Sequence, residues 1–219
     1  KKKYSGKIEL KIINQVLRGV LDPESRQWAE KAFEYVDIIG GLPSRDRPNP
    51  DKHIDVIFSW AKDTGKMVHV HIDQENNPNE HDTELLARKT MENGLEGKVV
   101  AVHAVSVAAH SSKERKEIYK LMKAAGIIVV CCPSAAISMK QLPEIAELHN
   151  SIVPVPELLE AGVPVALGCD NISDIYQPLV DGDMYTELRI LAEACRLYDI
   201  DRLVEIATTN GQIALGIDH

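Results

Sequence analysis

Short apolar runs that alternate with helical segments constrain the fold of this chain more than any other feature. Their near-continuous Val and Ile content is typical of strands buried on both faces of a parallel sheet. The runs occupy residues 8–13, 36–41, 66–72, 98–104, 127–132 and 163–169. Helical spacing of apolar residues predicts helices at 23–35, 51–64, 80–93, 112–125, 154–162, 182–198 and 201–214, with a long loop before residue 154. The alternation predicts an α/β protein whose helices cover a parallel sheet.

Two architectures fit this alternation, an open doubly wound sheet and part of a (β/α)8 barrel. A doubly wound sheet binds ligands at one switch point, often beside a GxGxxG or GxxxxGK[ST] motif. Neither motif follows any of the strands, and polar residues close several strands instead of one. This pattern favours a partial barrel, in which the carboxyl ends of the strands carry ligands and catalytic groups.

Composition narrows the class of protein further. The 219 residues, 44% of them hydrophobic, suffice for one large domain with a substantial core. The net charge of −8 comes without a basic stripe, so we expect no nucleic-acid partner. No apolar run approaches the roughly 20 residues that span a bilayer, so we expect no membrane partner and a cytoplasmic location. The cysteines form no CxxC pair and are expected to be reduced and packed as small apolar residues: Cys131, Cys132, Cys169 and Cys195.

Polar residues close three of the predicted strands. His71 ends VHVHI, His103 ends VVAVH, and Asp170 follows VALGC. Residues two apart in a strand face the same side, so His69 and His71 point together, with His71 nearer the carboxyl end. Imidazole and carboxylate suit a first-row divalent ion such as Zn, Fe or Mn, which would lower the pKa of a bound water. A neighbouring residue must then move protons to the leaving group.

Several blocks of sequence, in order along nearly the whole chain, resemble the cytosine deaminase group of the amidohydrolase superfamily. The blocks are VHVHIDQENN, VVAVHAVSVAAHS, GIIVVCCPSA, LLEAGVPVALGCDNISDIYQPL and TTNGQIALGI. The resemblance implies a metal-dependent hydrolase of carbon–nitrogen bonds with one divalent ion, Zn or Fe. It implies that His71 is the strand-five metal ligand, that Asp170 is the strand-eight ligand, and that His103 is the strand-six His that assists the metal-bound water.

The same resemblance implies where the chain lies within a complete barrel. HVHID also resembles the strand-one HxH pair of the superfamily, but that register requires seven further βα units after residue 71, and only about three more strands follow. Residues 1–219 are therefore expected to form a single catalytic barrel fragment with strands three to eight. Strands one and two, with their HxH ligands, are expected to precede Lys1, and the small flanking β-sandwich domain is expected to be absent. His69 is then a mouth-lining or packing residue.

The resemblance also implies substrate-binding residues and two departures from the family pattern. Gln15 matches a Gln that bonds the substrate ring, and Tyr176 matches an aromatic position beside it, although a surface loop tyrosine is an equal alternative. Gln74 stands where the family carries a proton-shuttling Glu, and Asn171 where it carries a second Asp. A carboxamide cannot take up a proton at neutral pH. Proton transfer would then depend on His103 and Asp170, or on Asp73. Four further histidines match no role in the family and need only surface positions: His53, His110, His149 and His219.

Three functions remain open. The first is deamination, or related carbon–nitrogen hydrolysis, of a pyrimidine-like or triazine-like small molecule by metal-activated water, with His103, Gln74 and Asp170 as catalytic residues and Gln15, Asn171 and Tyr176 as substrate-binding residues. The second is hydrolysis of a cyclic amide by the same centre. The third is an inactive barrel fragment that lacks the strand-one ligands and folds only with another segment or subunit. Incomplete strands and apolar helices favour a homo-oligomer.

Overall fold

A single parallel sheet of five strands organises the computed structural model, which describes residues 1–217. The strands are β1 (Ile39–Gly41), β2 (Val68–Ile72), β3 (Val99–His103), β4 (Ile128–Cys131) and β5 (Val165–Leu167). The α-helices are α1 (Pro23–Lys31), α2 (Pro50–Thr64), α3 (Asp82–Glu92), α4 (Ser112–Ala124), α5 (Pro133–Ile137), α6 (Val155–Ala161), α7 (Met184–Cys195), α8 (Ile200–Ala207) and α9 (Thr209–Ala214). Short 3-10 helices are η1 (Lys2–Tyr4), η2 (Ala32–Glu34), η3 (Pro43–Asp46) and η4 (Val105–Ala109).

The order of the strands decides between the two predicted architectures. Each strand pairs in parallel with the next one along the chain, from β1 through β5, without a reversal. A doubly wound sheet would change direction at a switch point. The α/β class is therefore confirmed, and the sequential parallel sheet has the strand order of a barrel segment.

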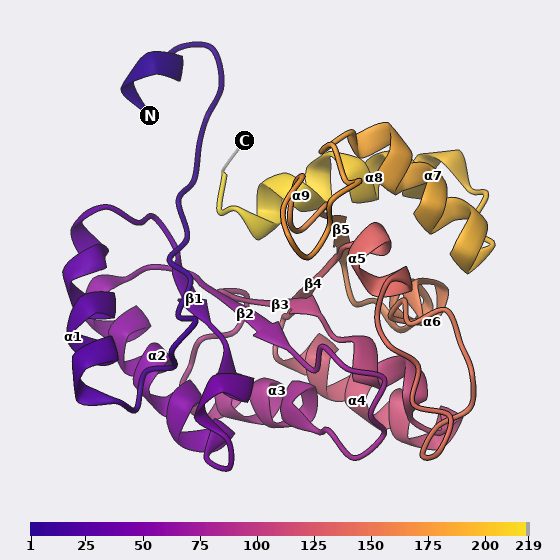
Figure 1. Cartoon of the computed structure of the whole chain (residues 1–219), viewed down its shortest axis with the longest axis horizontal. Helices are drawn as coiled ribbons and strands as arrows, with labels where there is room; N and C mark the ends of the chain where they lie inside the picture. The colour runs from indigo at the N-terminus through magenta and orange to yellow at the C-terminus, as the bar shows by residue number, and fades with distance from the viewer. Residues whose placement is uncertain (218–219) are drawn as a thin grey trace.

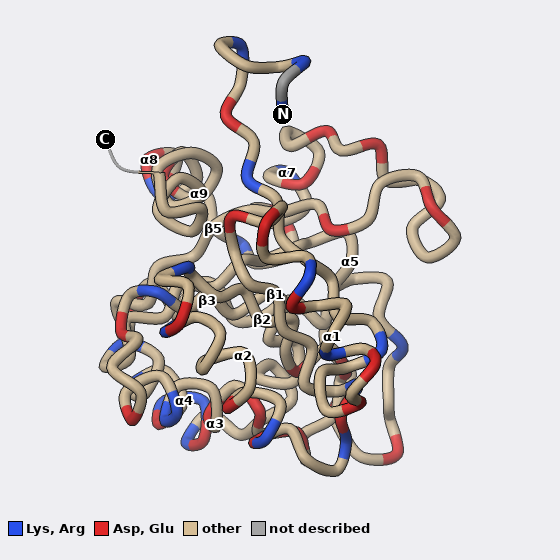
Figure 2. The backbone as a smooth tube through the Cα atoms, turned by 90° about the vertical axis from the view of Figure 1, so that its left-hand side faces the viewer, with Lys and Arg blue, Asp and Glu red and all other residues tan. Residues whose placement is uncertain are grey.

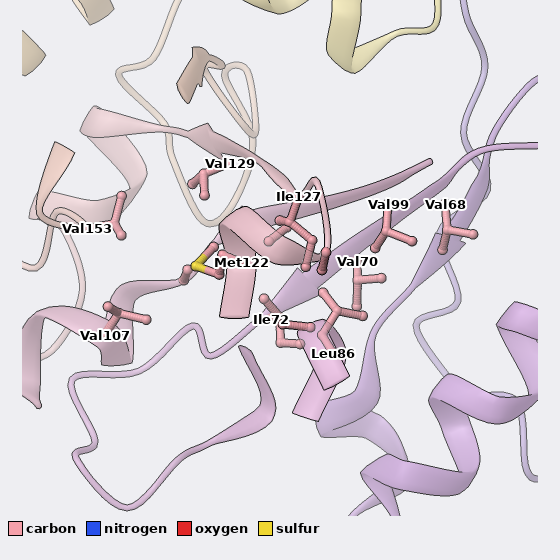
Figure 3. Close-up of a cluster of buried hydrophobic side chains, with 14 of the residues drawn as sticks. Val68, Val70, Ile72, Leu86, Val99, Val107, Met122, Ile127, Val129 and Val153 are labelled. Carbon is pink, nitrogen blue, oxygen red and sulfur yellow. The ribbon is translucent and has the colours of Figure 1, made fainter. Parts of the chain in front are cut away.

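One face of the sheet packs against α2, α3, α4 and α6, which lie together along one side of the strands (Figure 1). Alternate residues of β2 point to this face, and Figure 3 shows Val68, Val70 and Ile72 in the same cluster as Leu86 of α3 and Met122 of α4. Each of these side chains is almost completely buried. This core fixes the strands and so fixes where their carboxyl ends lie.

On the other face, Ala135 of α5 packs in the same cluster as Val102 and Cys132, and α9 covers the amino ends of the strands. There α9 packs on Val100 and Ala166, and Asn210 Nδ2 donates a 2.8 Å hydrogen bond to the Val165 carbonyl oxygen. His69 Nε2 lies 2.7 Å from the Ala214 carbonyl oxygen, and burial lowers the pKa of this ring to about 4. His69 is thus the packing residue that was expected. The rest of the carboxyl-terminal half of this face is left for a site.

The structure contradicts the predicted strand at 8–13. Only Ile13 bridges the sheet, opposite Ile38, while Ile8, Leu10 and Ile12 are exposed. A strand needs several paired residues in a row, whereas here the Ile12 carbonyl oxygen accepts from the Asp37 and Ile38 N–H groups and a single bridge follows at Ile13. The predicted helix 201–214 divides at Thr208 into α8 and α9, and the predicted long loop before residue 154 contains α5.

The charged residues and the helices agree with the composition of the chain. Figure 2 shows acidic and basic residues interspersed along the backbone, including along α3 and α4, with both signs on the same helices. None of the helices within residues 1–217 is both long and apolar enough to cross a membrane.

Candidate active site

Three polar side chains from the ends of three strands converge on the open half of the sheet. His71 Nδ1 of β2 lies 3.2 Å from His103 Nε2 of β3. The same His103 nitrogen lies 3.7 Å from Asp170 Oδ2, just beyond β5. The structure therefore brings together the three residues that the strand ends singled out, although their chemical roles stay predictions.

The backbone around these residues is left-handed at each strand end. Asp73, His103 and Asp170 have φ values of 47°, 76° and 62°, a conformation that costs a residue with a side chain about 1–3 kcal/mol. His103 lies opposite Ile72 in the register, and strict alternation would turn its ring toward the helices with Val99 and Ala101. The positive φ instead turns the ring toward His71.

Burial sets the protonation of the two histidines. It lowers the pKa of His103 to about 3, with a smaller contribution from nearby His71. It also lowers the pKa of His71, while Asp170 opposes that shift. Both rings are therefore neutral near pH 7, the form that ligates metals and accepts protons. Within residues 1–217, His103 Nδ1 is buried without a hydrogen-bond partner.

A cavity of about 360 Å³ opens beside this cluster. It is lined by His71 and Asp170, by Gln74, which was predicted as catalytic, and by the predicted substrate-binding residues Gln15, Asn171 and Tyr176. Tyr176 is 75% exposed, at the rim. His103 lies behind the lining and reaches the site through its contacts with His71 and Asp170. Segments that are far apart in the sequence thus line one cavity. The resemblance alone did not show that these residues lie together.

Sequence reasoning missed several residues that line the same cavity, among them Ser44, Arg45, Ser138 and Gln177. Gln177 Nε2 donates a 3.2 Å hydrogen bond to Asp170 Oδ2 and so orients the carboxylate. Asp174 Oδ1 accepts from the backbone N–H of Gln177 at 2.8 Å, which holds the loop in a turn. Ser44 and Arg45 follow β1, and their position after a strand was the signal that could have found them.

Asp73 does not face the cavity as a proton carrier. Its carboxylate accepts hydrogen bonds from the backbone N–H groups of Thr83, at 2.7 Å, and Asp82, at 3.2 Å, at the start of α3. Burial raises the pKa of this carboxyl, while the hydrogen bonds from Thr83 oppose the shift. Asp73 therefore anchors α3 to the end of β2, because a carboxylate satisfies the free N–H groups of a helix start.

Two histidines predicted at the surface are buried instead. His53 is fully buried in α2, and His110 is 4% exposed, with Nε2 2.9 Å from the Glu80 carbonyl oxygen. Both rings satisfy polar groups inside the fold, which a sequence pattern does not reveal. His149 is partly exposed, and His219 lies outside the described residues.

The donors fit a divalent metal in kind but not in number. An imidazole from His71 and a carboxylate from Asp170 are ligands that first-row divalent ions accept. A catalytic zinc site usually has three protein ligands. Within the part of the chain that the structure describes, no group of three or more His, Cys, Asp or Glu residues is arranged to hold a metal. The described residues thus supply part of such a site.

The match to known proteins agrees with this geometry. Residues 15–219 match the Amidohydrolase family, so this chain belongs to it. Members of this family bind a divalent metal. The predicted relationship is therefore confirmed at the level of the family.

Individual relatives place the chain within this family. An uncharacterized protein of Haemophilus influenzae is 40% identical over 159 residues, covering 71% of this chain and 58% of the relative. N-isopropylammelide isopropyl amidohydrolase of Pseudomonas sp. (strain ADP) is 29% identical over 203 residues, which cover 90% of this chain and 47% of that protein. Among solved structures, 5-methylcytosine deaminase of Klebsiella pneumoniae superposes with a TM-score of 0.89 at 25% identity, over 99% of this chain and 54% of that one. The chain spans about half the length of these relatives.

Proposed function

We propose that this chain carries part of the active site of a metal-dependent aminohydrolase that cleaves a carbon–nitrogen bond of a pyrimidine-like or triazine-like heterocycle. The observation that carries the proposal is the meeting of His71, His103 and Asp170 beside a cavity lined by Gln15, Gln74, Asn171 and Tyr176. Two of the similar proteins are named for nitrogen heterocycles, N-isopropylammelide and 5-methylcytosine.

His71 and Asp170 would hold the metal. When bound, a divalent ion acts as a Lewis acid and makes water available as a nucleophile near neutral pH. His103 accepts or returns a proton at Nε2, which lies between His71 Nδ1 and Asp170 Oδ2. The buried environment that lowers the pKa of His103 keeps this ring neutral before the reaction, so that it can accept a proton.

The amide side chains of the cavity orient the ring. Gln15 and Asn171 each offer a donor and an acceptor, and the face of Tyr176 can stack on a planar ring at the rim. Gln74 lies in the cavity but cannot exchange a proton. Proton transfer therefore passes through His103 and Asp170. Because Gln74 replaces the Glu that the resemblance implies at this position, we propose a substrate other than cytosine.

We further infer that the described strands correspond to part of strands three to eight of the barrel, with Ile13 at the end of the first. The sequential parallel order and the shortage of metal ligands support this numbering. The remaining ligands would come from two additional strands. The chain spans about half the length of its relatives, so we propose the activity for the whole protein and not for this chain alone.

Metal analysis combined with an activity panel tests the proposal. The purified full-length protein, loaded with zinc or iron, is assayed for ammonia or amine release from cytosine, 5-methylcytosine and N-isopropylammelide, and for ring opening of a cyclic amide. We expect His71→Ala to lose the metal and His103→Asn to keep the metal but lose activity. His149→Gln, outside the cavity, serves as the control. A protein without bound metal and without activity on any ring would refute the proposal, and ring opening alone would replace it with cyclic amide hydrolysis.

A further inference from the structure

Arg45 brings a positive charge to the cavity that the proposed chemistry does not use. It belongs to η3, the 3-10 helix that follows β1, and its exposed side chain lines the cavity together with His71, Gln74 and Asp170. Within residues 1–217, its guanidinium has no ion-pair or hydrogen-bond partner. Its donors therefore remain available to a ligand.

The polar groups around Arg45 leave an excess of donors. Among the described residues that line the cavity, Asp170 supplies the one carboxylate, and its Oδ2 already accepts from Gln177. The other polar lining groups are mostly amides and hydroxyls, which both donate and accept, whereas a guanidinium only donates. A ligand that fits this cavity must supply acceptor oxygens or negative charge.

The net charge of the cavity lining also favours a ligand with negative charge. Among the described lining residues, Arg45 and Asp170 are the charged side chains and cancel each other, and Gln74 adds no charge. A divalent cation held by Asp170 would make the sum positive. The local charge would then oppose the net charge of −8 of the chain and favour an anion.

The backbone that carries Arg45 is held in place by its neighbour Asp46. Asp46 Oδ2 accepts from the Val20 backbone N–H at 2.8 Å and from buried His53 Nδ1 at 2.6 Å. His53 Nε2 in turn accepts from the Leu42 backbone N–H at 2.9 Å, just before η3. This network joins the segment of Gln15 to the segment of Arg45, so the backbone that carries the guanidinium is held in place, which lowers the entropy lost on binding.

We propose that Arg45 selects oxo-substituted heterocycles that carry negative charge over neutral aminopyrimidines. This inference rests on the proposed function, because it names the substrate class of the same cavity. A planar guanidinium can donate charge-assisted hydrogen bonds to a ring oxygen that carries delocalised negative charge. A neutral ring of the same size lacks the charge that strengthens those bonds.

A pair of ring probes tests this selectivity without turnover. Barbiturate is a monoanion at neutral pH, whereas uracil is neutral and has the same ring size. Titration calorimetry on the metal-loaded protein is expected to give tighter binding of barbiturate. Arg45→Gln should weaken barbiturate binding about 10- to 100-fold and change uracil binding less than about 3-fold. Arg45→Lys should fall between the two, and Arg88→Gln on α3, an equal loss of charge far from the cavity, should change neither.

The outcomes separate the two proposals. Equal losses for both probes in Arg45→Gln, or no loss for barbiturate, would overturn the role of Arg45 while leaving a protein that still releases ammonia or amine as proposed. Failure of the unsubstituted protein to bind either ring, together with inactivity on every ring of the panel, would overturn the proposed function itself. Loss of barbiturate binding alone supports the selection by charge.

Discussion

Replacement of Asp46 by Ala tests whether one carboxylate holds two walls of the cavity together. Asp46 Oδ2 accepts from Val20 N–H at 2.8 Å and His53 Nδ1 at 2.6 Å, and Oδ1 accepts a longer 3.4 Å bond from Leu21 N–H. The carboxylate side chain is 8% exposed and the His53 side chain 0%. Ala leaves these donors without a partner.

The magnitude follows from the two short hydrogen bonds. A hydrogen bond to a charged group contributes about 1.5–3 kcal/mol, and the longer contact to Leu21 adds little. Water can reach part of the vacated space, so we expect Asp46→Ala to lower the free energy of unfolding by about 2–5 kcal/mol. Asp46→Asn keeps an oxygen where both short bonds end and should cost only about 1–2 kcal/mol.

Urea denaturation at neutral pH measures both free energies, and a double-mutant cycle with His53→Ala isolates the pair. We expect a coupling energy of about 1–3 kcal/mol. Because Asp46 also fixes the segments of Gln15 and Arg45, Asp46→Asn should raise KM more than it lowers kcat. A loss below about 0.5 kcal/mol for Asp46→Ala, or full additivity in the cycle, would refute the reasoning.

Three further outcomes follow from the structure. Burial lowers the pKa of His53 below its ordinary value of 6.5. The neutral ring therefore contributes stability that is complete above that pH and is lost as the pH falls below it. Denaturation should show a smaller decrease in the free energy of unfolding between about pH 7 and pH 5 for His53→Gln than for the unsubstituted protein. Arg196 ends α7 with a φ of 53°, so Arg196→Gly should stabilise the fold by about 1 kcal/mol and Arg196→Ala should not, as thermal unfolding would show. His103→Asn, which keeps a residue tolerant of left-handed φ, should lower kcat by about 10²- to 10⁴-fold with bound metal unchanged by elemental analysis.

The sequence predicted the features that depend on local pattern. Apolar runs identified the five strands of the sheet, because parallel strands buried on both faces require continuous Val and Ile. Their polar ends identified His71 and Asp170, because parallel strands bring their carboxyl ends to one edge. The same logic would have found Arg45, four residues past the end of its strand β1, had the segment after β1 been treated as part of the site.

Other features depend on contacts that no local pattern contains. Residues 8–13 alternate in polarity like a strand, yet the segment meets the sheet at its end, around Ile12 and Ile13, and forms no regular strand. His53 and His110 lie among polar sequence, and only the fold reveals that each ring satisfies a buried backbone group. The orientation of His103 depends on one φ angle, which alternation along β3 would have assigned to the opposite face.

The left-handed strand ends indicate that the site is shaped by the backbone before any ligand binds. Ala104 N–H donates to the Ile72 carbonyl oxygen at 3.1 Å, and Ser106 N–H donates to the Asp73 carbonyl oxygen at 3.0 Å. These bonds join the ends of β2 and β3 just after the His71–His103 contact, while the core behind Ile72 holds both strands. Strain of about 1–3 kcal/mol at each left-handed residue persists only because its surroundings leave no alternative. We therefore expect removal of a bound metal to leave the separation of the two imidazoles unchanged, because these backbone bonds and the core hold the two strand ends in place.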